Sequence, residues 1–163
     1  MLRVGIGYDS HRFAAGRGLV LGGVRIPHSH GLAGHSDADV VAHAVTDAIL
    51  GAAGAGDIGR LFPDTDDRWR DADSMDLLAR AHDVVRARGY ACRQADVTVI
   101  AEHPKLALHL EEMGGNLARR LDLSPAEVSV KAKTNEGMGF IGRGEGIAVI
   151  AVATVEARPS NRS

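Results

Sequence analysis

The sequence contains little of what marks several classes of protein. Its 163 residues include one cysteine, and aromatic residues make up only 4% of the chain. The single cysteine, Cys92, excludes an internal disulfide, and in its strand-like surroundings a buried thiol without a catalytic role is expected. No stretch has the apolar length of a membrane span, and the opening residues 1–13 lack the hydrophobic core of a secretory signal. We therefore expect a cytoplasmic protein with no membrane partner.

The chain also lacks an excess of charge of one sign. Its formal net charge of -2 gives no electrostatic reason to expect a nucleic acid as a partner. Hydrophobic residues at 45% and charged residues at 25% are typical of a globular protein. The length suits one compact domain, and no repeat or linker is visible. We expect a single domain over 1–163, with its core at 2–157 and a flexible tail at 158–163.

The spacing of apolar residues predicts an alternation of strands and helices. An alternating pattern predicts a strand over 90–102, and runs suited to extended chain predict strands over 2–13, 128–133 and 147–156, the last made of apolar and small residues. A short glycine-rich hairpin is expected from 19–21 and 24–26. Helical spacing predicts helices over 36–53, 74–88 and 106–121, the first capped by Ser36 or Asp37. The predicted class is α/β of the α+β type: one mainly four-stranded mixed sheet with helices packed on one face, plus the N-terminal hairpin.

Asp9 and His11 are candidates for holding a divalent cation. Side chains two residues apart on a strand project from the same face, so these two can converge on one ion. His43, on the polar flank of the first predicted helix, can supply a third ligand. A carboxylate with two imidazoles suits zinc and leaves a fourth position for substrate.

A second set of ligands competes with this one. Asp39 and His43 are four residues apart and share one helical face, and His35 and Asp37 lie near the start of the same helix. Spacing alone leaves both sets open.

Near the C-terminal end, the residues favour phosphate binding. The segment 131–136 offers two lysines, a hydroxyl and a carboxylate, and the glycine-rich stretch 137–146 adds backbone donors and Arg143. Since the carboxylate of Glu136 cannot itself stabilise an anionic phosphate, it indicates a bridging magnesium ion. Lys105 is a candidate for another phosphate contact. The alternative for this region is a solvated hairpin loop.

Four motifs in order resemble a known family. They are GYDSHRF near the start, GHSDADVVAHAVTDA, GDIGRLFPDTD, and TNEGMGFIGRGEGIA near the end. Together, from about Leu2 to Val155, the chain resembles the 2-C-methyl-D-erythritol 2,4-cyclodiphosphate synthases. It departs from the family at Ala38, where glycine is frequent, and at Lys133 and Asn135, where hydroxyl residues are common. These departures bear on the nucleotide contacts rather than on the reaction.

The resemblance implies an enzyme, a phosphorus-oxygen lyase of non-mevalonate isoprenoid synthesis. It would cyclise a cytidine diphosphate derivative of methylerythritol 2-phosphate and release CMP. The resemblance also implies that Asp9, His11 and His43 hold zinc, that Glu136 contacts magnesium or manganese, and that His35 and Thr134 act at the phosphoryl centre. The implied substrate contacts are Asp9, Ser10, His11, His35, Ser36, Asp57, Ile58, Gly59, Phe62, Pro63, Asp64, Thr65, Asp66, Ala101, Pro104, Lys105, Leu106, Ala107, Lys133, Thr134, Asn135, Glu136, Phe140 and Arg143.

The resemblance further implies a homotrimer with its sites between subunits. A central channel near Phe140, Arg143 and Glu145 would be able to take an isoprenoid diphosphate. Two other functions compete with the synthase: a different metal-dependent phosphoryl-transfer enzyme or hydrolase, and a non-catalytic module that binds zinc or a nucleotide.

Overall fold

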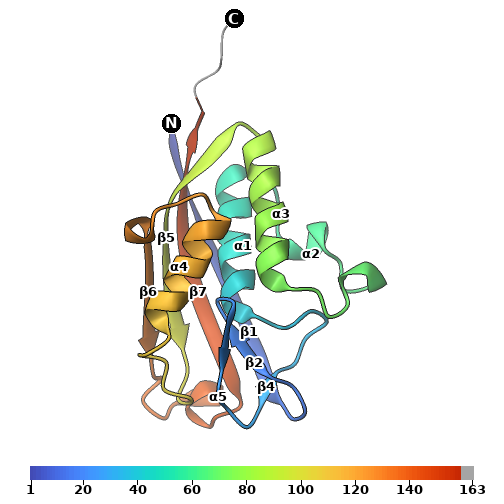
Figure 1. The fold of residues 1–163 in the computed structure, drawn as a ribbon, viewed down its shortest axis with the longest axis vertical. Helices are drawn as coiled ribbons and strands as arrows, with labels where there is room; N and C mark the ends of the chain where they lie inside the picture. Colours follow the sequence, from blue (N-terminus) through green and yellow to red (C-terminus); the bar gives the residue numbers. More distant parts are fainter. Residues whose placement is uncertain (159–163) are drawn as a thin grey trace, which may run out of the picture.

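A computed structural model describes residues 1–158 and contains a five-stranded sheet in the order β4-β1-β7-β5-β6 (Figure 1). Its strands are β1 (Leu2–Ala14), β4 (Gly31–Leu32), β5 (Tyr90–Ile100), β6 (Val128–Lys133) and β7 (Gly146–Ala157). Neighbouring strands are antiparallel except β5 and β6, which are parallel. The predicted α/β class with a mixed sheet is confirmed. The fifth strand, β4, was not predicted because two residues are too short to give an alternating pattern.

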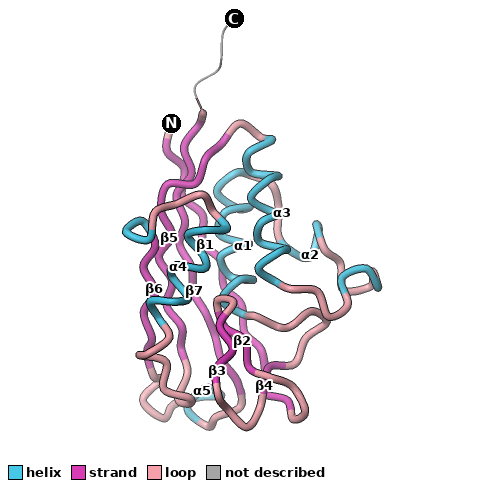
Figure 2. Tube along the Cα trace, viewed as in Figure 1, coloured by secondary structure: helices cyan, strands magenta, loops and turns pink. Residues whose placement is uncertain are grey.

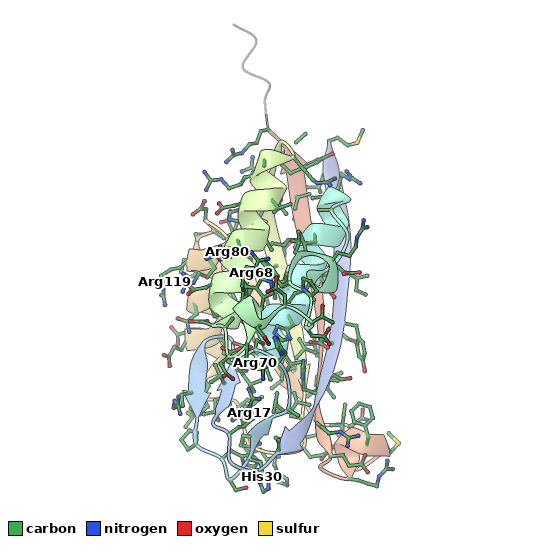
Figure 3. The ribbon with its side chains drawn as sticks, turned by 90° about the vertical axis from the view of Figure 1, so that its right-hand side faces the viewer. Arg17, His30, Arg68, Arg70, Arg80 and Arg119 are labelled. Carbon is green, nitrogen blue, oxygen red and sulfur yellow. The ribbon has the colours of Figure 1, made fainter. Side chains whose placement is uncertain are left out.

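The helices cover one face of this sheet. They are α1 (Val40–Ala53), α2 (Ile58–Leu61), α3 (Ser74–Ala87), α4 (Leu110–Arg120) and α5 (Gly139–Gly142), with short 3-10 turns η1 (Asp67–Trp69) and η2 (Pro125–Glu127). Figures 1 and 2 show α1, α3 and α4 in front of the strands. In the side view of Figure 3, no helix lies along the length of the opposite face in the chain described. The predicted arrangement of helices on one face is confirmed.

The predicted hairpin is also present, as a separate two-stranded sheet of β2 (Leu19–Leu21) and β3 (Val24–Ile26). Its turn is Gly22-Gly23, and both glycines have positive φ angles, a conformation that glycine adopts without steric cost. The third predicted helix begins later than expected, at Leu110, since Leu106 instead lies buried in the turn that precedes α4.

Helix α1 begins four residues later than predicted. Ala38 has a φ of 59°, in the left-handed region, so a right-handed helix cannot extend back through it. The side chain of Asp39 accepts hydrogen bonds from the backbone N–H groups of Val41 and Ala42 and caps the helix. The predicted capping by Ser36 or Asp37 is therefore wrong.

Two glycines bring α1 unusually close to β1. A Cβ atom built on Gly7 would lie 1.8 Å from the carbonyl oxygen of Ala44, and one on Gly5 would lie 2.0 Å from that of Ala48. Glycine is required at both positions because any side chain would collide with the helix backbone. This close approach places His43, on α1, against the end of β1.

The core lies between the helices and the covered face of the sheet. Most of α1 is buried, because it lies between β1, β7 and α3. Cys92 of β5 belongs to this core, as expected, and burial raises the pKa of its thiol to about 12. The cysteine therefore stays a neutral thiol.

The opposite face of the sheet is apolar and exposed in the single chain. Leu2, Val4, Ile6 and Tyr8 alternate along β1 on this face, with exposed fractions between 57% and 70%. Ile150 of β7 pairs with Tyr8 and continues the patch. A contiguous apolar surface of this kind is typical of an interaction face.

Two remaining predictions concern the tail and the membrane. Of the predicted tail only Arg158 is described, and its backbone N–H donates to the carbonyl of Gly89 at 2.8 Å. The other residues of that prediction lie outside the part of the chain that the structure describes. Within residues 1–158, no helix has both the length and the hydrophobicity required to cross a membrane.

Candidate metal centre

The structure brings Asp9, His11 and His43 together at the junction of β1 and α1. Asp9 Oδ2 lies 3.0 Å from His11 Nε2 and 3.0 Å from His43 Nδ1, and the two histidine nitrogens are 3.2 Å apart. Among the described residues, only this group of acidic, histidine or cysteine side chains has the geometry to hold a metal ion. A carboxylate and two imidazoles form a donor set that zinc accepts.

The electrostatics of the three groups favour mutual attraction. Burial would raise the pKa of Asp9, but hydrogen bonds and charge from His11 and His43 outweigh it, and the pKa falls well below its usual range. Burial would likewise lower the pKa of His11, but its contacts with Asp9 and the carbonyl of Ala33 outweigh it and raise the pKa. An ionised Asp9 and a protonated His11 therefore stabilise each other in the metal-free site.

The imidazole of His11 is oriented by the backbone. Its Nδ1 lies at hydrogen-bond distance from the carbonyl oxygen of Ala33. Because a carbonyl can only accept, Nδ1 carries the hydrogen and Nε2 is the nitrogen presented to Asp9. This is the tautomer that coordination through Nε2 requires.

The competing set of ligands does not assemble. Asp39 is fully buried, and its carboxylate accepts hydrogen bonds from the backbone N–H groups of Gly22, Gly23, Val41 and Ala42 at 2.8–3.1 Å. All of these bonds tie the β2–β3 turn to the start of α1, and none faces the metal site. Asp39 therefore has a structural role.

The segment that carries His35 and Ser36 lies beside the centre. Arg17 donates to the carbonyls of Gly34 and Ser36 and so clamps the segment on both sides of His35. The Nε2 atom of His35 lies 3.3 Å from the carbonyl oxygen of Asp66. Figure 3 shows Arg17 below Arg70 on the side of the molecule occupied by the 57–73 segment. His35 thus joins the metal-site loop to that segment.

The predicted contacts between 57 and 66 belong to a segment whose end, at Asp66, meets His35. Asp57 caps α2 through the N–H of Arg60, and Phe62 packs edge-on against Trp69 at 5.0 Å between ring centroids. Asp66 caps η1 and pairs with Arg68. The other predicted positions in this segment are Ile58, Gly59, Pro63, Asp64 and Thr65, of which Ile58 and Gly59 belong to α2.

A second group of predicted residues surrounds a cavity of about 230 Å³ between the β5–α4 loop and the end of β6. The lining residues include Ala101, Pro104, Lys105, Leu106, Ala107, Lys133 and Thr134. The peptide bond between His103 and Pro104 is cis. The segments 101–107 and 133–134, both expected to contact the substrate, therefore line one pocket.

The loop after β6 is anchored by a glutamate that the sequence analysis did not single out. Glu102 accepts hydrogen bonds from the backbone N–H groups of Asn135 and Gly137 at 2.7 and 3.3 Å. Between them, Glu136 adopts a φ of 53° and its carboxylate lies 3.5 Å from the Thr134 hydroxyl. The only sequence signal for Glu102 was its place at the end of the strand predicted over 90–102.

Phe140 and Ser10 line a larger cavity, of about 740 Å³, together with His11, Arg12 and Glu145. The guanidinium of Arg143 pairs with Glu145 at 2.7 Å, and this pair raises the pKa of Arg143 and lowers that of Glu145. The residues predicted to line a channel thus lie next to the exposed side of His11.

The metal centre and the loop after β6 lie at the same end of the sheet but on different strands. Ser10 of β1 pairs with Ala148 of β7, which pairs with Ile100 of β5, which in turn pairs with Lys133 of β6. Three strand spacings separate Ser10 from Lys133, about 14 Å in total. The two groups of candidate residues are therefore not in contact within one chain.

Comparisons with known proteins agree over nearly the full length. The profile of the YgbB family matches residues 2–156. The curated 2-C-methyl-D-erythritol 2,4-cyclodiphosphate synthase of Salinibacter ruber is 56% identical over 155 residues, which cover 95% of this chain and 99% of that protein.

Solved structures agree as well. The IspF of Plasmodium falciparum in complex with CDP matches with a TM-score of 0.84 and 32% identity, over 96% of this chain and 97% of that one. The bifunctional IspDF of Campylobacter jejuni matches with a TM-score of 0.93 and 47% identity over 96% of this chain, which spans 42% of the longer protein. The chain therefore belongs to the YgbB family, the family of the 2-C-methyl-D-erythritol 2,4-cyclodiphosphate synthases.

Proposed function

We propose that this chain cyclises 4-(cytidine diphosphate)-2-C-methyl-D-erythritol 2-phosphate and releases CMP, as a phosphorus-oxygen lyase of non-mevalonate isoprenoid synthesis. An oxygen of the 2-phosphate bonds to the β-phosphorus, while the bond from that phosphorus to the oxygen of CMP breaks and CMP leaves with the electron pair. The observation that carries the proposal is the cluster of Asp9, His11 and His43 in a chain 56% identical to a curated synthase.

Asp9, His11 and His43 would hold zinc, and Glu136 would contact magnesium or manganese. When bound, such cations neutralise the phosphate oxygens, which would otherwise repel each other as the new bond forms. The Nδ1–H of His11 and the ionised state of Asp9 support the zinc assignment, because His11 then faces the centre with Nε2, from which a metal would displace the proton, and Asp9 with a carboxylate oxygen.

The chain's own residues would hold the reacting groups in line. His35 stands beside the metal centre and would position the attacking phosphate, with Ser36 next to it in the chain, and Thr134 would orient the phosphates of the nucleotide. No side chain is needed as a nucleophile, because the attacking oxygen belongs to the substrate. The protein's contribution to this reaction is alignment and charge.

The cavity lined by Ala101, Pro104, Leu106 and Lys133 would take the cytidine nucleotide, with Lys105 beside its phosphates. Its combination of apolar walls, backbone groups and cations supports this assignment. CDP is bound to the similar Plasmodium falciparum protein. The segment with Asp57–Gly59 and Phe62–Asp66 would then bind the methylerythritol part.

We also propose a homotrimer with sites at its subunit interfaces. The exposed face with Leu2, Val4, Ile6 and Tyr8 would pack against other copies of this chain. The separation of about 14 Å between β1 and β6 supports this, since it exceeds the length of a diphosphate. The loop with Glu136 would therefore meet the metal centre of a neighbouring copy.

An isoprenoid diphosphate would enter the central channel near Phe140 and Arg143. Failure to bind geranyl diphosphate would reject this proposed channel ligand.

Product analysis tests the proposed reaction. The protein with zinc and magnesium should convert the cytidine substrate to a cyclic diphosphate and CMP, and His43→Ala should abolish turnover. Free phosphate or a linear product would indicate another phosphoryl-transfer enzyme and refute the proposal. Retained activity in His43→Ala would reject the zinc assignment.

A further inference from the structure

The nitrogen of His43 that faces away from Asp9 contacts two buried hydroxyl groups. His43 Nε2 lies 2.9 Å from Ser74 Oγ and 3.1 Å from Ser36 Oγ, whereas its Nδ1 faces Asp9. Ser74, the first residue of α3, has no exposed surface, and Ser36 is 6% exposed. The ring of His43 therefore lies between the metal centre and a closed polar pocket.

The direction of the hydrogen bonds in this pocket follows from Asp37. The Ser74 hydroxyl lies within hydrogen-bond distance of Asp37 Oδ1, and a carboxylate has no hydrogen to donate, so Ser74 is the donor. Asp37 is held in turn by the backbone N–H groups of Asp39 and Ser74, at 3.1 and 3.2 Å. With its hydrogen given to Asp37, the oxygen of Ser74 can only accept from His43.

The consequence concerns the hydrogen on the imidazole. Accepting from Nε2 requires that Nε2 carries the hydrogen, which leaves the lone pair of Nδ1 facing the centre. Ser36 is compatible with a hydrogen on His43 Nε2, because the Ser36 oxygen accepts from the N–H of Ala38 and its own hydrogen can point to Ser74. A hydrogen-bonded carboxylate behind a metal-binding histidine is a known way to fix its tautomer and ring orientation.

We propose that Asp37 and Ser74 are positioning residues that hold His43 in the tautomer and orientation that a metal requires. The proposal rests on the proposed function in one respect, the assignment of Asp9, His11 and His43 as metal ligands. Neither residue touches the substrate or the metal. Both act through His43, and Ser74 connects the start of α3 to the ligand on α1.

The test compares zinc affinities, measured by competition with a chromophoric chelator. Ser74→Ala removes the acceptor and should weaken zinc binding about 10- to 100-fold, the range found for such outer contacts. Asp37→Asn leaves the hydroxyl of Ser74 free to reorient and should also weaken zinc binding, by less than Ser74→Ala does. Thr46→Val is the matched control, because it removes a different fully buried hydroxyl, on α1, whose one hydrogen bond within the described residues is to the carbonyl of Ala42. Its affinity should stay within about twofold of wild type.

Nitrogen-15 spectra of the zinc-bound wild type provide a readout that needs no variant. They should show the hydrogen of His43 on Nε2, and a hydrogen on Nδ1 would overturn the proposal. It would also fail if Ser74→Ala bound zinc like wild type, or if Thr46→Val lost as much affinity as Ser74→Ala. A wild type that binds zinc but forms no cyclic product would refute the proposed function and leave this inference standing.

Discussion

The close approach of β1 and α1 leads to a prediction about a single methyl group. In Gly7→Ala the new Cβ would lie 1.8 Å from the carbonyl oxygen of Ala44, whereas real Cβ atoms essentially never come closer than 3.0 Å. The neighbouring atom belongs to the backbone, so no side chain can rotate away. The strand and the helix must therefore separate by more than about 1 Å, or the strand must twist.

That displacement should lower the free energy of unfolding. Overpacking in a core costs about 1–3 kcal/mol, which corresponds to a fall of roughly 3–10 °C in the unfolding midpoint for a chain of this size. The metal centre should suffer as well, because Asp9 and His11 belong to β1 and His43 to α1. Ligand distances tolerate only about 0.2 Å, so the zinc affinity should fall by on the order of tenfold or more.

Gly51→Ala provides the control, since it is the same substitution at a glycine of α1, the helix that Gly7 of β1 contacts. The nearest atom to a Cβ at Gly51 is the carbonyl oxygen of Ile6 at 4.0 Å, an ordinary contact, and the position is exposed. Alanine should therefore stabilise α1 by about 0.8–1 kcal/mol. Thermal unfolding with and without zinc, together with chelator competition, measures both variants. Wild-type stability and zinc affinity in Gly7→Ala would refute the argument that this glycine seats the helix.

Three further predictions concern charge, assembly and the buried carboxylate. The pKa of His11 is raised in the folded metal-free protein, so its contribution to stability is present below about pH 6.5 and is lost as the pH rises through the folded pKa. Zinc must displace that proton, so the thermal shift caused by zinc should grow between about pH 6 and pH 8, and a shift independent of pH would contradict this. Mixing His43→Ala with Glu136→Ala subunits should restore about a quarter of wild-type activity. In the proposed cyclic trimer, about a quarter of the interfaces formed at random combine an intact His43 with an intact Glu136 of the neighbouring subunit. No recovery after verified subunit exchange would place both residues in one chain's site. In Asp39→Asn an amide N–H would face the N–H of Gly23, whose hydrogen bond Asp39 Oδ2 accepts at 2.8 Å in the wild type. Urea denaturation should therefore show that the free energy of unfolding falls by about 1–3 kcal/mol. An unchanged midpoint would exclude the capping role.

Much of the fold could be predicted from the sequence because the strands and helices have clear periodicities. The apolar residues that alternate at the start of 2–13 and the run of apolar and small residues at 147–156 placed β1 and β7 within a few residues of their observed bounds. The start of α1 was missed for a local reason, since a single alanine, Ala38, adopts a left-handed conformation that apolar spacing cannot reveal.

The metal-ligand set shows where spacing alone stops. Asp39 and His43 had the right separation for a helical pair, and only the distant turn at Gly22-Gly23 shows that Asp39 is already occupied. Ser74 could not be connected with His43, because the contact joins residues on two different helices. The family resemblance chose the cluster that the structure brings together, whereas the partners that orient it required the tertiary structure.

The register of β1 has a consequence for the order in which the centre can form during synthesis. Asp9 pairs with Val149 and His11 with Ile147, so the first strand made finds its central partner in the last. Until β7 has been made, no strand of the sheet pairs with this part of β1, because β4 pairs only with Phe13 and Ala14. Zinc capture should therefore come late, after most of the chain is complete, and it should slow unfolding more than it accelerates folding.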